Sequence, residues 1–309
     1  MRVEASLPWE QGVAGSTPAV QTKKTTQRFV REIQGGKTTM KGIVHNASTI
    51  VFGMQKGGVG KTTLSVNFAA ALAAKGHKTL IIDADTQGTA TDYFFAERPA
   101  PEQTIAKLYD QTDDFNIITE DDSIIYETPH KNLFIAPASL SLAEADKNGA
   151  RLPKSYERLN IWIEGTCKPM FDYIIIDCPP SMSFIAQNTM IAGDYIVIPT
   201  IAVSESFEAL KLYISLLKRI KALKPSVKIL GAAVNQYREN RVINTTYLQK
   251  LKESGVPILA TIHDCTDFQK LSHNKQFVTD FPELKRQRIG KEINALVNTI
   301  LKDIKEDQR

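Results

Sequence analysis

Cysteines and long apolar runs are scarce in this 309-residue sequence, and each shortage excludes a class of protein. The three cysteines, Cys167, Cys178 and Cys265, form no CxxC pair, so neither a disulfide framework nor a zinc site is indicated. No stretch approaches the ~18 consecutive apolar residues of a membrane span. The first residues also lack the apolar core of about 7–15 residues that a signal peptide needs.

An excess of charge of either sign is also missing. The sequence has 38 Lys and Arg against 34 Asp and Glu, a net charge of +4. Residues 1–39 hold six of the basic and three of the acidic residues, which leaves 32 basic and 31 acidic residues in 40–309. Global charge therefore does not predict nucleic-acid binding, which would need a local basic patch.

Residues 1–46 differ in composition from the rest of the chain. They are rich in Thr, Gln, Gly, Ser and Pro and have no sustained apolar period, so we expect them to be disordered. Gly35–Thr39 resembles a phosphate loop but has no strand before it. Met40 is a plausible alternative start, because the first predicted strand begins about eight residues later. We therefore predict one domain over residues 47–309.

From residue 49 onward, short β-branched runs alternate with helical segments. The predicted strands are 49–53, 79–83, 133–136, 173–177, 195–199, 228–234 and 257–262. The predicted helices are 61–75, 204–223, 242–254 and 283–304. This alternation favours an α/β fold, a doubly wound and mostly parallel sheet with helices on both faces. Ligands of such sheets bind at the carboxyl ends of the strands.

The stretch "MQKGGVGKTT", residues 54–63, has the context of a phosphate loop. A strand containing Ile50 to Phe52 precedes it, and a helix from Leu64 follows. Its glycines allow tight turns that bring N–H groups to phosphate oxygens. Lys61 can reach the β- and γ-phosphates of ATP, and the Thr62 hydroxyl can bind Mg²⁺. The residues predicted to bind nucleotide in this loop are Lys56, Gly57, Gly58, Val59, Gly60, Lys61, Thr62 and Thr63.

The loop departs from the regular pattern GxxxxGK[ST] and carries a second lysine. Gln55 stands where that pattern has its first glycine, whereas the form KGGVGKTT fits fully. Lys56 lies five residues before Lys61, although one lysine is enough to hold a phosphate. The alternatives are a glycine-rich turn that binds no ligand and, for Lys56, a solvated loop lysine.

Three aspartates follow apolar strands, where phosphate chemistry needs carboxylates. Asp83 and Asp85 follow the strand that begins at Thr79, and Asp177 ends the run Tyr173 to Ile176. We expect Asp83 to hold the water shell of Mg²⁺, Asp85 to orient the attacking water, and Asp177 to make an outer-shell contact to the metal. Alone, any of them could be a turn or helix-capping residue.

Together these motifs resemble the ParA/MinD family of deviant Walker A ATPases, and most of all its Soj-like partition ATPases. The resemblance covers about 47–305, chiefly through Lys56–Thr63, Asp83–Gly88 and Asp172–Ser181. Weaker matches are Asn132–Ser139, Ile198–Pro199 and Ser206–Leu210. The resemblance implies a P-loop NTPase fold with Mg²⁺ and ATP, slow hydrolysis stimulated by a ParB-like partner, and an adenine contact at Asn235.

The resemblance also gives the second lysine a role. It implies that Lys56 reaches across an ATP-dependent homodimer and touches the phosphates held by the other subunit. In this view Lys56, Lys61 and Asp85 are the catalytic residues, and Thr62, Asp83 and Asp177 serve the metal.

ParA dimers bind DNA without sequence preference, so the resemblance makes basic surface residues candidates for that contact. In the helix 204–223 we predict an apolar stripe that lies opposite a basic face. The stripe consists of Leu212, Leu216, Ile220 and Leu223. The DNA candidates are Lys211, Lys218, Lys221, Arg238, Arg241, Lys285, Arg286 and Arg288. Each cluster could equally be a solvated helix face. The stretch 263–267 contains two aspartates, which would repel phosphate.

Two other functions use the same nucleotide site. A MinD-like positioning ATPase would need an amphipathic membrane helix at the C-terminus, but the last residues mix both charges and lack aromatics. We therefore expect that helix to pack on the domain and predict no stable membrane anchor. A regulator with little turnover is the other alternative. The reading that the resemblance favours is a cytoplasmic, nucleoid-associated partition ATPase.

Overall fold

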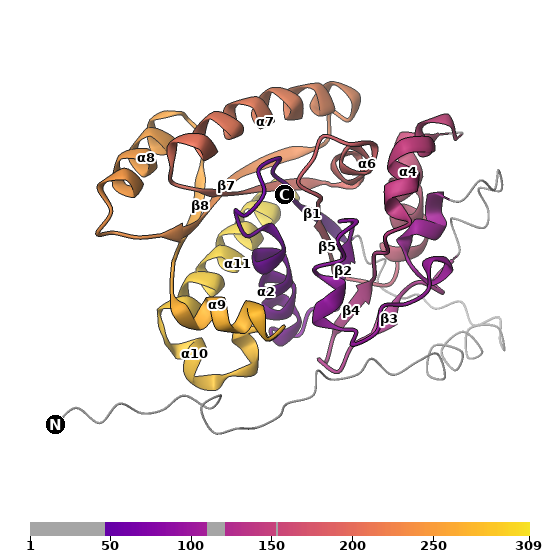
Figure 1. Ribbon diagram of the computed structural model, residues 1–309, viewed down its shortest axis with the longest axis horizontal. Helices are drawn as coiled ribbons and strands as arrows, with labels where there is room; N and C mark the ends of the chain where they lie inside the picture. Colours follow the sequence, from indigo (N-terminus) through magenta and orange to yellow (C-terminus); the bar gives the residue numbers. More distant parts are fainter. Residues whose placement is uncertain (1–46, 110–120, 153) are drawn as a thin grey trace.

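The strands predicted from the apolar runs form one sheet. The computed structural model describes residues 47–109, 121–152 and 154–309, so the predictions for 1–46, including the start at Met40, lie outside the described residues. The described strands are β1 (Ser48–Phe52), β2 (Thr79–Asp83), β3 (Tyr126–Glu127), β4 (Leu133–Ala136), β5 (Tyr173–Asp177), β6 (Tyr195–Ile201), β7 (Lys228–Tyr237) and β8 (Ile258–His263). They form an eight-stranded sheet in the order β3-β4-β2-β5-β1-β6-β7-β8 (Figure 1).

The sheet is parallel apart from the β3–β4 pair, and helices cover both of its faces. Along β5, Ile174 and Ile176 face one apolar cluster and Ile175 faces the other, as expected for a strand buried on two sides. Helices α2, α9, α10 and α11 pack on the Ile175 side, and α4 to α8 on the opposite side (Figure 1). The doubly wound α/β fold predicted from the sequence is confirmed.

The structure contains several short α-helices that were not predicted from the sequence. Their bounds are α2 (Lys61–Ala74), α4 (Leu142–Asn148), α5 (Arg158–Trp162), α6 (Phe184–Ala192), α7 (Ser204–Leu223), α8 (Val242–Glu253), α9 (Thr266–His273), α10 (Pro282–Arg286) and α11 (Arg288–Asp307). Short 3-10 segments are η2 (Thr91–Tyr93), η3 (Pro101–Gln103), η4 (Ile105–Tyr109), η5 (Gly149–Arg151), η6 (Ser155–Glu157) and η8 (Val278–Asp280), and η7 (Ile163–Cys167) is a π-helical turn. Elements as short as β3, α4 and α5 leave too few apolar positions for a period to be recognised.

The prediction of a single helix over 283–304 is wrong, because the helix is interrupted at Gln287. Gln287 has an extended backbone, with ψ at 175°, and it separates α10 from α11. The two helices come so close that a Cβ on Gly290 would lie 2.4 Å from the Leu284 carbonyl oxygen. A glycine is therefore needed where the two backbones meet.

The predicted apolar stripe of α7 is partly wrong. The buried positions of this helix are Ser206, Leu210, Tyr213, Leu216, Leu217 and Ile220. Leu212 and Leu223 are instead 66% and 72% exposed. Apolar side chains occur on more than one side of this helix, so period alone does not fix which side is buried, and in the structure Tyr213 lies on the buried side in place of Leu212.

The C-terminal helix packs on the domain, as expected. Its buried residues are Ile289, Gly290, Ile293, Leu296, Val297, Ile300 and Ile304. The apolar side chains among them belong to the same cluster as α2 and β8, beside which α11 runs (Figure 1). Among the described residues, no helix has both the length and the apolar content to cross a membrane.

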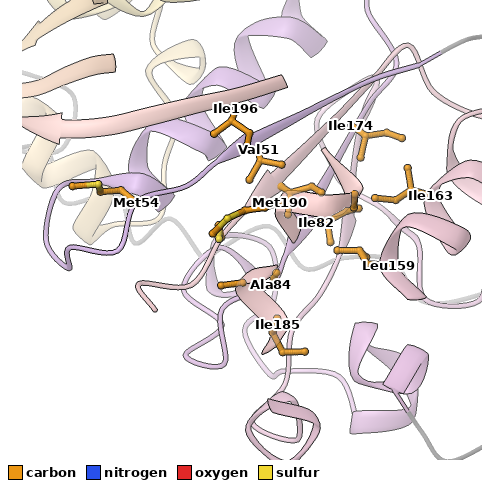
Figure 2. Packing of buried hydrophobic residues seen from close by; sticks show 14 of the residues in the cluster. Val51, Met54, Ile82, Ala84, Leu159, Ile163, Ile174, Ile185, Met190 and Ile196 are labelled. Carbon is orange, nitrogen blue, oxygen red and sulfur yellow. The ribbon is translucent and has the colours of Figure 1, made fainter. Parts of the chain in front are cut away.

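The core on the α4–α8 side anchors the two loops that leave β1 and β2. Figure 2 shows Val51, Ile82 and Ile174 packed among residues of the covering helices. Met54, which begins the glycine-rich loop, and Ala84, which follows β2, are buried in the same cluster (Figure 2). Both loops therefore start from fixed points at the carboxyl edge of the sheet.

A matched pair of leucine variants tests the orientation of α7. We expect Leu216→Ala to lower the free energy of unfolding by about 2–4 kcal/mol, because Leu216 is buried. Leu212→Ala should cost less than about 0.5 kcal/mol, because its side chain is already in water. Urea unfolding of both variants measures the difference, and equal losses would contradict this orientation.

Candidate functional site

The loop between β1 and α2 turns through two residues with left-handed backbones. Gly58 has φ +73° and Gly60 has φ +83°, a region that residues with a Cβ adopt at a cost. Gly60 is constrained a second time, because a Cβ there would lie 2.1 Å from Nδ2 of Asn235. The loop ends where α2 begins at Lys61, so its N–H groups and the helix N-terminus have the arrangement that suits a phosphate.

Two consecutive amides at the end of β7 hold this loop. Asn235 donates from Nδ2 to the Val59 carbonyl at 3.1 Å, and Gln236 donates from Nε2 to the Gly58 carbonyl at 3.0 Å. Asn235 is buried, and Gln236 has a left-handed backbone with φ +53°. No pattern in the sequence points to Gln236, apart from its place after Asn235, whose predicted contact is to adenine.

The two lysines of the loop have different surroundings. Lys61 is buried, and its Nζ donates to the Lys56 carbonyl at 3.4 Å. Lys56 is half-buried, and its ammonium makes no ion pair or hydrogen bond within the described parts of the chain. Lys61 thus lies inside the loop, whereas the charge of Lys56 is available to a ligand or a partner.

Asp83 and Asp177 lie side by side at the ends of β2 and β5. They are paired in register across the two strands, and both are fully buried. Oδ2 of Asp83 accepts hydrogen bonds from N and Oγ1 of Thr91, both at 2.7 Å. Oδ2 of Asp177 accepts one from Oγ1 of Thr62 at 2.6 Å. Oδ1 of Asp177 is buried and has no hydrogen-bond partner among the described residues.

Burial raises the pKa of both carboxyl groups. The pKa of Asp177 rises to about 8 through loss of hydration and the charge of Asp83, against the opposing effects of Thr62 and Lys61. The pKa of Asp83 rises to about 6, mainly through loss of hydration, although its hydrogen bonds from Thr91 and Asp85 oppose the rise. A carboxylate pair in a dry site is stabilised by a cation.

This donor set suits Mg²⁺ bound together with a phosphate. No group of three or more His, Cys, Asp or Glu side chains in the described residues could hold a metal by itself. Mg²⁺ usually takes only one or two protein ligands and fills its remaining positions with water and phosphate oxygens. The orphaned oxygen of Asp177, its neighbour Asp83 and the hydroxyl of Thr62 therefore fit a hydrated Mg²⁺ beside the phosphate loop.

Asp85 lies in the turn that leaves β2. Its side chain is buried, and Oδ1 accepts a hydrogen bond from the Gln87 amide at 3.0 Å. Its own amide donates to Oδ1 of Asp83 at 3.1 Å, which ties the turn to the buried carboxyl pair. The three aspartates singled out in the sequence are thus brought together at one edge of the sheet.

The predicted DNA residues fall into two groups. Lys218, Lys221, Arg241, Lys285 and Arg286 are exposed and make no ion pair within the described residues. Lys211, Arg238 and Arg288 are exposed but already paired with carboxylates.

The pairs of the second group reduce its positive charge. Lys211 pairs with Glu208 at 2.9 Å, and Arg288 pairs with Glu292 at 2.8 Å. Arg238 donates from Nε to Asp264 at 2.6 Å, so it neutralises one of the two aspartates expected to repel phosphate.

A strand, a glycine-rich loop and a helix, with aspartates at neighbouring strand ends, are the arrangement of the P-loop NTPase fold. A family model described as an AAA domain matches residues 47–229. The sporulation initiation inhibitor protein Soj of Bacillus subtilis is 33% identical over 200 residues, 64% of this chain and 76% of that protein. The chromosome partitioning protein ParA of Caulobacter vibrioides is 33% identical over 226 residues, 70% of this chain and 82% of that protein. The chain belongs to the ParA/MinD family and is Soj-like within it.

Solved structures agree with this assignment. A putative plasmid partition protein of Borrelia burgdorferi bound to AMPPNP has a TM-score of 0.66 and 26% identity, and the match covers 83% of this chain and 99% of that one. A Cyanothece McdA variant in complex with ATP has a TM-score of 0.71 at 21% identity, covering 82% and 96%. The second likeness shows the fold alone.

A variant of Asp177 tests the burial of the carboxyl pair. The unfolded chain releases the Asp177 proton near pH 4 and the folded chain only near pH 8, so unfolding releases a proton between these values. The free energy of unfolding of the nucleotide-free protein should therefore fall as pH rises from about 4 to 8.

Asp177→Asn should remove much of this slope and raise the thermal midpoint at pH 8. Glu97→Gln, at an exposed carboxylate, serves as the control and should change neither quantity. Thermal unfolding across this pH range measures both, and equal slopes in wild type and Asp177→Asn would contradict the assignment.

Proposed function

We propose that this chain is a Mg²⁺- and ATP-dependent partition ATPase, with residues 47–309 acting as one ATPase domain. The observation that carries the proposal is the unpartnered Oδ1 of the buried Asp177. Such an oxygen is costly unless a cation reaches it. This carboxyl group lies beside Asp83, and its other oxygen accepts a hydrogen bond from Thr62 at the start of α2. The relatives described as partition proteins support the cellular role.

Each residue of the site has a role in this proposal. The loop N–H groups and Lys61 hold the phosphates, and Thr62 with Asp83 and Asp177 holds the metal and its water shell. Mg²⁺, when bound, neutralises charge on the phosphates. Asp85 orients the attacking water.

We keep Asn235 as the residue that contacts adenine. Its side chain also donates a hydrogen bond to the Val59 carbonyl of the phosphate loop. The same bond fixes the loop, so Asn235 would link recognition of the base to the position of the phosphates.

We further propose that Lys56 contacts the phosphates held by a second protomer. Its unpaired ammonium at the edge of the loop supports this role, because a second cation completes the neutralisation of charge only when two loaded protomers meet. Nucleotide state then determines dimer state, and loss of the γ-phosphate loosens the dimer. Hydrolysis is slow until a ParB-like partner stimulates it.

The output of the switch is binding to nonspecific DNA, and hence association with the nucleoid. The unpaired cations of α7, α10 and the β7–α8 loop support it, because such binding depends on phosphate contacts. A MinD-like membrane role has less support, since α11 buries its apolar stripe against the domain. The pairing of Arg238 and Arg288 with carboxylates makes them weaker candidates than Lys218 and Lys221.

Two lysine variants separate nucleotide binding from dimerisation. We expect Lys61→Ala to weaken Mg-ATP binding by about 10- to 100-fold, because a charge-assisted contact to phosphate is lost. Lys56→Ala should bind Mg-ATP with nearly the wild-type affinity but remain monomeric. Calorimetry and sedimentation velocity measure the two properties. If Lys56→Ala still forms a dimer in Mg-ATP, its proposed contact with the phosphates of the second protomer is refuted. Normal ATP binding by Lys61→Ala would refute the proposed phosphate site.

Charge reversal on α7 tests the DNA surface. The double variant Lys218→Glu, Lys221→Glu should lose co-sedimentation with random-sequence DNA in Mg-ATP. Each lost phosphate contact should reduce the slope of log K against log salt concentration by about one. The control is Lys302→Glu, Lys305→Glu on α11, which should bind like wild type. Equal loss in both double variants, or binding as strong in Mg-ADP as in Mg-ATP, would contradict the proposed surface or its nucleotide control.

A further inference from the structure

The turn that carries Asp85 is a small closed structure. Beyond the bond from the Gln87 amide to Oδ1 of Asp85, the Gly88 amide donates to the Asp85 carbonyl at 2.9 Å. Gly88 has φ +63°, so the chain reverses there with a left-handed residue. Asp85 and Gly88 are buried, whereas Gln87 is exposed to water. Only the outer side of this turn is accessible to further contacts.

Arg98 makes that outer contact. Its Nη2 donates to the Gln87 carbonyl at 2.6 Å. The same guanidinium binds Asp92 with two bonds, from Nε to Oδ1 at 2.7 Å and from Nη2 to Oδ2 at 2.9 Å. Asp92 in turn donates its amide to the Gly88 carbonyl at 3.0 Å. The bonds therefore run in a ring from the turn, through Arg98 and Asp92, and back to the turn.

The guanidinium also lies directly on the glycine of the turn. A Cβ on Gly88 would be 2.9 Å from both Cζ and Nη1 of Arg98. Glycine suits the left-handed backbone of residue 88, and a Cβ there would displace the Arg98 guanidinium. The side chains of Arg98 and Asp92 are each 35% exposed, and an ion pair of that exposure adds little to stability. The ring is better explained by the position it gives to the turn.

We propose that Arg98 is a positioning residue that holds the carboxylate of Asp85 in its working orientation. The inference rests on the proposed function, in which Asp85 orients the attacking water. Arg98 fixes the carbonyl of Gln87, and the amide of Gln87 fixes Oδ1 of Asp85, so one residue separates the guanidinium from the carboxylate. A planar fork suits this task, because it binds a carboxylate with two bonds and a carbonyl at the same time.

The test is the rate of ATP hydrolysis by variants of the full chain. Arg98→Ala should lower kcat by about 10- to 100-fold, the scale of a misplaced catalytic group, and leave the KM for ATP within about twofold. Arg98→Lys keeps the charge but not the fork and should recover only part of the loss. The control is Lys107→Ala, because the side chain of Lys107 is also 35% exposed and ion-paired, and it should hydrolyse ATP like wild type.

A double variant shows whether Arg98 acts through Asp85. If it does, Arg98→Ala should cost nothing further in an Asp85→Ala background, because the carboxylate to be positioned is gone. A thermal midpoint of Arg98→Ala close to that of wild type would exclude general loss of structure. A large further loss in the double variant would mean that Arg98 acts elsewhere, and the inference would be wrong.

The outcomes separate this inference from the proposed function. Hydrolysis by Asp85→Ala at the wild-type rate would refute the proposed role of Asp85, and the inference would fall with it. A slow Asp85→Ala combined with wild-type kcat in Arg98→Ala would refute the inference alone. A rise in KM without a fall in kcat would assign Arg98 to nucleotide binding and would also overturn it.

Discussion

Two carboxyl groups buried side by side, at the ends of β2 and β5, are the constraint on which the rest of this site depends. Asp83 has its oxygens occupied by Thr91 and by the amide of Asp85, but Asp177 keeps one oxygen without a partner in the described residues. Two ionised groups so close and so dry repel each other, so the ligand-free protein keeps a proton on the pair at neutral pH. A cation bound beside the pair would stabilise both carboxylates.

The rest of the fold places the phosphate loop and the turn after β2 beside this pair. The parallel sheet, buried on both faces, brings the carboxyl ends of β1, β2 and β5 to one edge. Met54 and Ala84 fix the starts of the two loops in the core, and the amides of Asn235 and Gln236 hold the phosphate loop from β7. Both loops are therefore held in place from the core and from β7.

The sequence predicted the seven longer strands and the position of the phosphate loop, because buried parallel strands and glycine-rich turns have strong local patterns. It also placed Asp83, Asp85 and Asp177 just after apolar strands, and in the structure they lie together at one edge of the sheet. Contacts between distant segments have no such pattern. Gln236 binds the Gly58 carbonyl and Arg98 binds the Gln87 carbonyl, and neither contact leaves a pattern in the sequence. The buried face of α7 likewise depends on packing against the sheet. These features could be found only in three dimensions.

The most direct test of the buried pair is the number of protons released when Mg-ATP binds. Titration calorimetry at pH 7 in buffers of different ionisation enthalpy measures it. Because the pKa of Asp177 lies at about 8 in the free protein, and a carboxylate beside a cation must ionise, we expect release of about one proton per Mg-ATP bound. Asp177→Asn should release correspondingly fewer. Tight binding with no proton released by the wild type would contradict the account.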